Sequence, residues 1–235
     1  MISLVHLRRF FAERALRKRI FRLPHEPYLP GSDERVVEIP WAMSCYDRER
    51  LVLEVGCSFA TDAYIEALRK LRIPELHGID VSGREAPFFI KKTADIRDSG
   101  YPSSFFGLIF CISTIEHIGM DNRARYEPVH ELPVTSDADT LALLEIRRIL
   151  KSGGRIVLTV PFGKYHDYGW FFQYDRARLD SLIKRSRLRI IQTDYFHYRG
   201  DGWYSSDAHA LTNTLYQGNG APCAAGVACV LLTKP

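Results

Sequence analysis

Short apolar runs alternate with longer helical stretches along the chain from residue 51 onward. This alternation is typical of βαβ units, in which helices connect the parallel strands of one sheet. The run at residues 106–113 is almost wholly apolar, as expected of a strand buried on both faces. The runs that predict strands are residues 51–55, 76–80, 88–96, 106–113, 155–160, 188–198 and 224–233.

Helical patterns lie between these runs, at residues 61–71, 137–150 and 178–185. Lys151 and the pair Gly153-Gly154 follow the second pattern and suit a helix C-terminal cap. Four prolines fall within residues 24–44, which we interpret as an extended connector. The sequence therefore predicts two parts: a basic N-terminal helix with a proline-containing connector at residues 1–44, and one α/β domain at residues 45–235.

The composition is that of an ordinary globular protein, with 235 residues, of which 46% are hydrophobic and 26% charged. This excludes a disordered, collagen-like or coiled-coil chain. No apolar run approaches the roughly 20 residues of a membrane-spanning helix. Five scattered cysteines form no CxxC pair, so neither a disulfide framework nor a zinc cluster is indicated. We expect a cytoplasmic protein.

Positive charge is concentrated at the start of the chain, where residues 1–23 carry seven Lys and Arg residues and one acid, Glu13. Such a segment favours peripheral contact with an anionic membrane surface, here the inner membrane face through residues 1–22, or contact with nucleic acid. The alternative is a solvated helix that packs on the domain, because Lys18 interrupts the apolar sector. The rest of the chain is slightly acidic, so no nucleic-acid partner is expected.

Polar residues follow the predicted strands at the edge where ligands bind in open α/β sheets. Asp80 ends the second strand, 24 positions after Gly56, and its carboxylate suits the two hydroxyls of a ribose. The turn after the first strand has one glycine of the three that a dinucleotide site uses. Glu54, two residues earlier, would repel a pyrophosphate and attract a cationic amine. An adenosine-containing cofactor other than a nicotinamide dinucleotide is therefore predicted.

Five segments in order, LVLEVGCSFATD, HGIDVS, TADIRD, FGLIFCISTIEHIG and LLEIRRILKSGGRIVLTVPFG, resemble the motifs of class I S-adenosylmethionine-dependent methyltransferases. The resemblance spans residues 52–163. It implies a Rossmann-like, doubly wound, seven-stranded sheet whose last strand, residues 224–233, runs antiparallel, and S-adenosyl-L-methionine as cofactor. Residues 45–235 would form the methyltransferase domain. Ser58 and Ala60 replace the second and third glycines of the family's GxGxG loop.

The resemblance also implies a cofactor site. In the family, the loop after the first strand wraps the methionine part, and the acid in that strand organises its amino end. The acid after the second strand holds the ribose. An acid and the apolar residue after it, near the end of the third strand, receive the adenine amino group and pack on its ring, and the end of the fourth strand lines the sulfonium. The matching residues are Glu54, Gly56, Cys57, Ser58, Asp80, Val81, Asp95, Ile96, Ile112 and Ser113.

Three residues are candidates for catalysis: Glu116, His117 and His166. The first two follow the fourth strand, where the transferred methyl would emerge, so that His117 could act as a general base. A divalent-metal site with His166 is a second possibility, but Ser113 replaces the first acid of the ExxEH pattern, and we predict no metal. The third possibility is that Glu116 and His117 only cap the following turn.

The acceptor is the least defined part. An aromatic stretch at residues 165–174 suits a wall for a sugar or planar ring, or it packs the next helix. GSDERVVEIPW, STIEHIG and TVPFG loosely resemble methyltransferases associated with cell-surface polysaccharide assembly. We therefore expect an enzyme that methylates an oxygen, rather than a nitrogen, of a small-molecule or glycan acceptor. The alternatives are an RNA or protein methyltransferase, although the DPPY-type tetrad is missing, and a non-catalytic S-adenosylmethionine-binding protein.

Overall fold

The computed structural model describes residues 21–123, 133 and 135–235. The basic N-terminal segment predicted to contact a membrane, residues 1–22, lies outside the described residues except for its last two. No helix among the described residues combines the length and the apolar character needed to cross a membrane.

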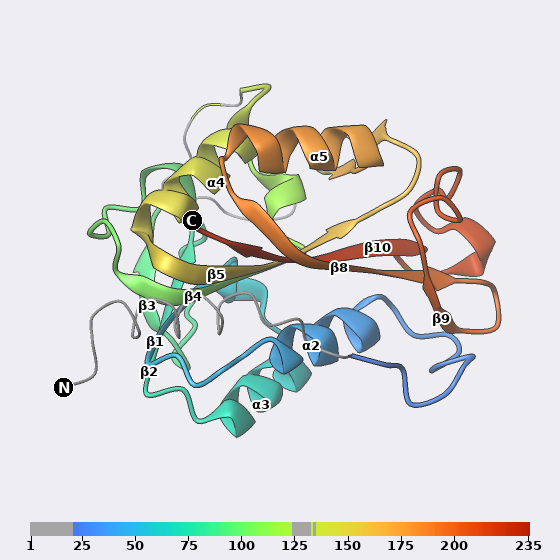
Figure 1. Ribbon diagram of the computed structural model, residues 1–235, viewed down its shortest axis with the longest axis horizontal. Helices are drawn as coiled ribbons and strands as arrows, with labels where there is room; N and C mark the ends of the chain where they lie inside the picture. The colour runs from blue at the N-terminus through green and yellow to red at the C-terminus, as the bar shows by residue number, and fades with distance from the viewer. Residues whose placement is uncertain (1–20, 124–132, 134) are drawn as a thin grey trace.

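The described residues form one eight-stranded sheet, in the order β3-β2-β1-β4-β5-β10-β8-β9, and a separate hairpin of β6 and β7. Four helices flank the large sheet (Figure 1). The strands are β1 Leu51–Val55, β2 Glu75–Asp80, β3 Ile90–Thr93, β4 Phe106–Ile112, β5 Leu150–Pro161, β6 His166–Asp167, β7 Phe172–Gln173, β8 Arg189–Tyr198, β9 Trp203–Ser206 and β10 Gly226–Thr233. The helices are α2 Arg35–Ser44, α3 Asp62–Leu71, α4 Ala138–Ile149 and α5 Arg176–Arg185, with 3-10 turns η1 Cys57–Phe59, η2 Ile96–Asp98, η3 Ile115–His117 and η4 Gly218–Gly220.

The strand directions confirm the predicted Rossmann-like sheet. β3, β2, β1, β4 and β5 run parallel, whereas β10 is antiparallel to both β5 and β8, as predicted for the last strand. The predicted number of seven strands is wrong by one. β9 pairs with the carboxyl half of β8 and lies between the last two predicted strands, where no strand was predicted. It has only four residues and follows two glycines with positive φ, so its sequence carries little strand pattern.

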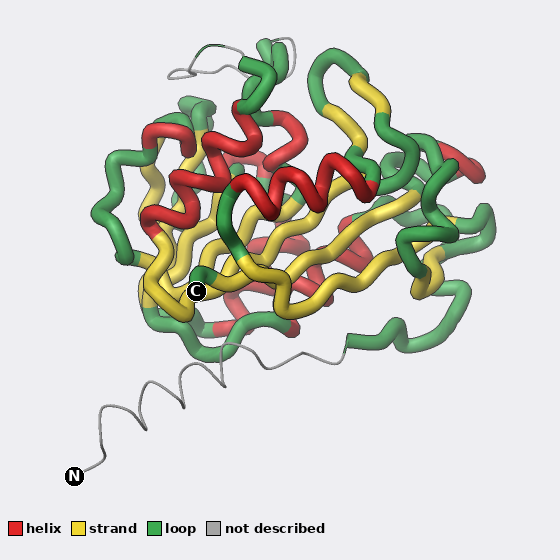
Figure 2. Tube along the Cα trace, turned by 45° about the horizontal axis from the view of Figure 1, so that its top comes forward, coloured by secondary structure: helices red, strands yellow, loops and turns green. Residues whose placement is uncertain are grey.

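Helices cover both faces of the sheet, with α4 and α5 on one side and α2 and α3 on the other (Figures 1 and 2). Alternate residues of each central strand face opposite layers. In β4, Ile109 and Cys111 pack with α4 and α5, whereas Leu108 and Phe110 pack with α2 and α3. This two-sided core explains why the β4 sequence is apolar throughout.

The prediction of an extended connector is wrong for residues 35–44, which form α2 with Pro40 inside it. Val37, Trp41 and Ala42 lie on one face of this helix and are fully buried against the sheet. Pro40 lies on the exposed face, where its lost backbone hydrogen bond costs least. Burial of the apolar face, at roughly 2 kcal/mol for each large side chain, outweighs that cost.

The predicted cap of the helix before β5 is also misplaced. α4 ends at Ile149 and continues directly into β5, so that Gly153 and Gly154 lie within β5 and not beside the helix end. Gly153 has a φ of 73°, and its N–H donates to the carbonyl of Lys234 near the end of the chain. The glycine pair therefore accommodates an irregular start of β5 and not a helix cap.

Replacing Trp41 tests whether α2 is an integral part of the core. Its indole is fully buried, and Nε1 donates to Asp194 Oδ2 on β8 at 2.6 Å. We expect Trp41→Ala to lower the free energy of unfolding by about 3–5 kcal/mol in urea denaturation. Leu29→Ala, at a site 40% exposed just before α2, is the control and should change it by less than about 1 kcal/mol. Equal effects of the two substitutions would contradict this account.

Candidate functional site

A cavity that is partly open to solvent lies at the carboxyl ends of β1, β2 and β4. Most of the predicted cofactor residues line it: Glu54, Gly56, Asp80, Val81, Asp95, Ile96, Ile112 and Ser113. His117 lines it as well. Cys57 and Ser58, also predicted, do not line the cavity, but the Ser58 N–H contacts the lining residue Asp80. The cavity therefore lies where the strand-end pattern placed a ligand.

Gly56 sits where the ends of β1 and β4 approach most closely. Its φ is +90°, a conformation that favours glycine, and its N–H donates to the Ile79 carbonyl at 2.9 Å. A Cβ at this position would lie 2.5 Å from Oγ1 of Thr114, whose single hydroxyl hydrogen has the Val55 and Ile112 carbonyls within hydrogen-bond distance. The single glycine of the loop is thus required by both backbone conformation and space.

Asp80 is oriented by two backbone N–H groups. Ser58 donates to Oδ2 and Ser82 donates to Oδ1, each at 2.8 Å. Each carboxylate oxygen keeps a second lone pair, so Asp80 can still accept hydrogen bonds from two hydroxyl groups in the cavity. Ser58 thus positions Asp80 through its backbone N–H, and its contact with a cofactor stays a prediction. Cys57 is buried, and burial raises the pKa of its thiol to about 12.

Asp95 forms a buried ion pair with Arg97. The backbone N–H of Arg97 donates to Oδ1 at 2.8 Å, Nη2 donates to Oδ2 at 2.6 Å, and Nε contacts both oxygens. The guanidinium is only 3% exposed and also donates to the Pro133 carbonyl. Asp95 is therefore rigid, and its salt bridge uses most of its acceptor capacity.

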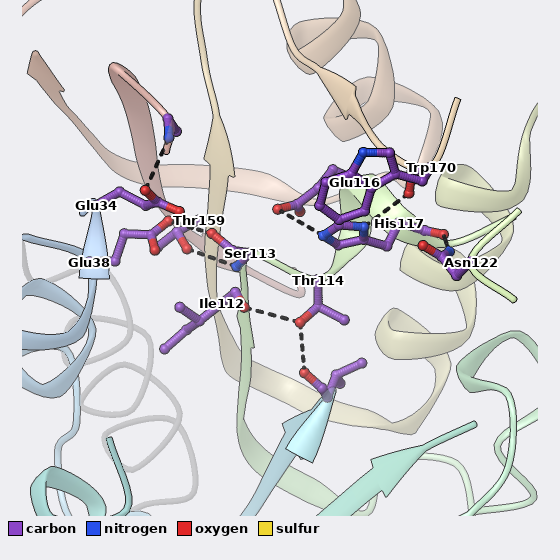
Figure 3. Close-up of polar contacts among 12 residues, drawn as sticks. Glu34, Glu38, Ile112, Ser113, Thr114, Glu116, His117, Asn122, Thr159 and Trp170 are labelled. Carbon is purple, nitrogen blue, oxygen red and sulfur yellow. Dashed lines mark hydrogen bonds and ion pairs between the residues drawn. The ribbon is translucent and has the colours of Figure 1, made fainter. Parts of the chain in front are cut away.

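Helix α2 brings a cation to the cavity that was not predicted. Arg35 lines the cavity and donates through Nη1 to Glu38 Oε2 at 2.9 Å. Glu38 is fully buried and accepts a hydrogen bond from Ser113 Oγ at 2.7 Å, which ties α2 to the end of β4 (Figure 3). The apolar spacing of Val37 and Trp41 was the available signal for this helix, and the prolines obscured it.

Several carboxyl groups near the cavity are buried. Burial raises the pKa of Glu54 well above its usual range, while Arg35 and a hydrogen bond from Tyr64 oppose the shift. Burial likewise raises the pKa of Glu116 well above its usual range. Oε2 of Glu116 has no hydrogen-bond partner among the described residues. The cavity thus has an acidic wall in which Arg35 lies beside the carboxyl groups.

His117 is held by the hairpin that follows β5. Nδ1 lies 3.0 Å from the carbonyl of Trp170, and the two rings lie 4.9 Å apart at 31° (Figure 3). Because a carbonyl oxygen only accepts, Nδ1 carries the hydrogen, and Nε2 holds the lone pair of the neutral ring. Nε2 lies 4.0 Å from Glu116 Oε1. This geometry suits a general base, as predicted for His117.

The structure does not bring His166 to the cavity. His166 is exposed on β6, and its ring lies 4.4 Å from that of Tyr168. In the part of the chain that is described, no three His, Cys, Asp or Glu side chains are grouped so that they could hold a metal ion. The predicted aromatic stretch divides into two parts: Phe171, Phe172 and Tyr174 are buried, whereas Trp170 is half-buried against His117.

No protein-family model matches the chain, and no curated protein matches it. Solved structures do share the fold. The [4+2]-cyclase SpnF is 13% identical, with a TM-score of 0.55 over 97% of this chain and 94% of that one. The 1,6-didemethyltoxoflavin-N1-methyltransferase of Burkholderia thailandensis, solved with its substrate and S-adenosylhomocysteine, is 8% identical, with a TM-score of 0.52 over 84% and 78%.

A TehB-like SAM-dependent methyltransferase of Corynebacterium glutamicum is 15% identical, with a TM-score of 0.50 over 84% of this chain and 87% of that one. At such identities the likeness shows a common Rossmann-like α/β fold. One of these three proteins is described as a cyclase, so the fold alone does not determine the reaction.

Glu34 provides a test of whether burial raises the pKa values of the carboxyl groups in this region. It is 8% exposed and accepts a hydrogen bond from the Ala224 N–H, and burial, reinforced by Glu38, raises its pKa from 4.5 to about 7. The folded state therefore keeps a proton that the unfolded state releases. The stabilisation is complete below about pH 4.5 and is lost as the pH rises through about 7.

We expect the melting temperature of the wild type to fall relative to that of Glu34→Gln between about pH 5 and about pH 8, because glutamine does not ionise. Thermal denaturation followed by circular dichroism measures this difference. Glu85→Gln, at an exposed position, is the matched control and should follow the wild type at every pH. A pH-independent difference between Glu34→Gln and the wild type would contradict the raised pKa.

Proposed function

We propose that the protein is an S-adenosylmethionine-dependent methyltransferase that acts on an oxygen of a small-molecule or glycan acceptor. The observation that carries the proposal is the order of chemical groups along one cavity. Arg35 and Glu54 lie at one end, Asp80 lies at the end of β2, and Asp95 and Ile96 lie beyond β3. An amino acid, a ribose and a purine are joined in this order in the proposed cofactor.

The first of these ends suits a zwitterion. Arg35 and Glu54 both line this part of the cavity, and although burial raises the pKa of Glu54, the positive charge of Arg35 partly opposes that shift. A guanidinium is suited to a carboxylate, and a carboxylate and backbone carbonyls are suited to an ammonium group. Arg35 would therefore hold the carboxylate of the methionine part, and Glu54 would stabilise its ammonium group.

The rest of the cavity suits an adenosine. Asp80, with one lone pair of each oxygen used by the backbone, would accept hydrogen bonds from the two ribose hydroxyls. Ala94, Ile96 and Ile118 would pack on the flat faces of the purine. These features support the proposed cofactor independently of the sequence resemblance, which matched Asp80 and Asp95 but not Arg35.

When bound, S-adenosylmethionine supplies an electrophilic methyl group on a cationic sulfur. That positive charge would favour the ionised form of the Glu54 carboxyl group, whose pKa is raised by burial. His117 Nε2 would remove the proton from an acceptor hydroxyl, while the Trp170 carbonyl keeps the hydrogen on Nδ1. The other task of the chain is alignment of the acceptor oxygen with the methyl group.

The acceptor and its setting rest on the sequence resemblance and on the hairpin. Trp170 lies half-buried beside His117 and offers an aromatic face to a sugar or another ring. We place the reaction in the cytoplasm, in cell-surface polysaccharide biosynthesis, with residues 1–22 as a candidate contact to the inner membrane face. The five cysteines, all free thiols, agree with a reducing compartment.

Calorimetric titration tests the cofactor and the role of Arg35 together. S-adenosylhomocysteine should bind with micromolar affinity, and NAD should not bind. Arg35→Ala should weaken the binding of S-adenosylhomocysteine by about 10- to 100-fold, because a charge-assisted hydrogen bond to its carboxylate is lost. It should leave the binding of 5′-methylthioadenosine, which lacks the amino-acid end, nearly unchanged. Equal loss for both ligands would remove Arg35 from the carboxylate site, and no binding of S-adenosylhomocysteine to the wild type would overturn the proposed cofactor.

A second experiment tests His117 as the base. With labelled S-adenosylmethionine and a panel of glycan and small-molecule hydroxyl acceptors, His117→Ala should lower turnover by about a hundredfold or more and leave S-adenosylhomocysteine binding unchanged. His25→Ala, an exposed histidine remote from the cavity lining, is the matched control. Full turnover of His117→Ala would return Glu116 and His117 to a structural role.

A further inference from the structure

Asn122 carries a buried hydrogen-bond acceptor that has no partner among the described residues. Its Nδ2 donates to the carbonyls of His117 at 2.7 Å and Met120 at 3.2 Å (Figure 3). Carbonyl oxygens only accept, so these two bonds fix the orientation of the amide and direct Oδ1 away from them. The residue is 6% exposed and lines the cavity, and Oδ1 accepts no hydrogen bond from the described chain.

An unpaired buried amide oxygen is costly, at roughly 1–3 kcal/mol. A folded chain does not retain such a group by default, because most buried acceptors find a donor. Since Asn122 lines the cavity, a ligand that carries an N–H or O–H group can supply the missing donor there. The part of the ligand that does so depends on which end of the cavity Asn122 occupies.

Asn122 lies at the same end of the cavity as Asp95. α4 and the residues just before it link the two regions, because α4 contacts both η2 and η3. The Pro133 carbonyl accepts from Arg97 Nη1, and Ala138 packs so closely on Gly119 that a Cβ there would lie 2.1 Å away. Ile96, Ile118 and Met120 also pack into one hydrophobic cluster. Arg35 and Glu54 belong to the opposite end. Asn122 would therefore face the purine and not the amino-acid part of the cofactor.

The purine of the proposed cofactor carries one group with N–H donors, the 6-amino group. In the sequence resemblance its acceptor is Asp95, but Arg97 occupies most of the acceptor positions of that carboxylate. We infer that Oδ1 of Asn122 accepts a hydrogen bond from the 6-amino group of adenine and selects a 6-aminopurine over a 6-oxopurine. A 6-oxo group would place a second acceptor against Oδ1. This inference rests on the proposed function.

A double-mutant cycle between protein and ligand tests it. The ligands are S-adenosylhomocysteine and its 6-deamino analogue, in which hydrogen replaces the amino group, and the readout is the dissociation constant from calorimetry. Asn122→Ala should raise the dissociation constant of S-adenosylhomocysteine by about tenfold and change that of the analogue by less than about twofold. Asn213→Ala, an exposed asparagine that does not line the cavity, is the control and should leave both constants unchanged. Equal weakening of both ligands by Asn122→Ala would overturn the inference.

Asn122→Ala also removes the two bonds to the His117 and Met120 carbonyls, so its thermal denaturation is measured beside that of the wild type. If the variant does not fold, the affinities of the wild type for three ligands test the inference instead. It should bind S-adenosylhomocysteine about tenfold more tightly than the 6-deamino analogue and more tightly still than S-inosylhomocysteine. Equal affinities for the first two ligands would overturn the role of Asn122 and leave the cofactor intact. Absence of binding by all three would instead overturn the proposed function.

Discussion

The close approach of Gly56 to Thr114 is the constraint on which the cavity depends. It brings the ends of two neighbouring parallel strands together without an intervening side chain, so that the backbone of the loop after β1 and the start of η3 form two walls of one space. The Thr114 hydroxyl lies between both strand ends, within hydrogen-bond distance of the Val55 and Ile112 carbonyls. Any side chain at position 56 would push these walls apart. The positions of Asp80, through Ser58, and of Asn122, through His117, follow from where the two walls lie.

Charge inside this cavity is balanced in a manner that leaves room for a ligand. Asp80 is held by backbone N–H groups and Asp95 by Arg97, so both have fixed directions. Glu38 is held between Arg35 and Ser113. Glu54 and Glu116 are buried with less compensation, and the pKa of each is raised for that reason. A cationic ligand in this site would therefore stabilise the ionised form of these carboxyl groups. Arg35 is a cation that can pair with a carboxylate of the ligand.

The strand ends were predictable from sequence because they follow apolar runs whose length and composition fix a buried parallel sheet. Gly56, Asp80, Asp95 and Ser113 therefore fell on one edge as expected. The contribution of α2 was not predictable from local rules, because Pro40 signals a break unless the burial of Trp41 is known. The roles of Asn122 and Arg97 were not predictable either, because they depend on which carbonyl and carboxylate groups lie beside these residues in the folded chain. His166 follows β5 closely in the sequence, but it lies exposed on β6 and does not line the cavity, whereas Trp170 of the same hairpin contacts His117.

The position of β10 bears on how the chain is made. It follows the other strands of this sheet in the sequence, yet it lies between β5 and β8 and pairs with both. Until residues 226–233 leave the ribosome, β8 and β9 have no sheet to join, and β5 presents an open edge of the kind that promotes aggregation. The Lys234 carbonyl and side chain add the final contacts, to Gly153 and Leu150. The sheet beyond β4 therefore stays incomplete until residues 226–233 are synthesised, because β5 and β8 share β10 as their partner.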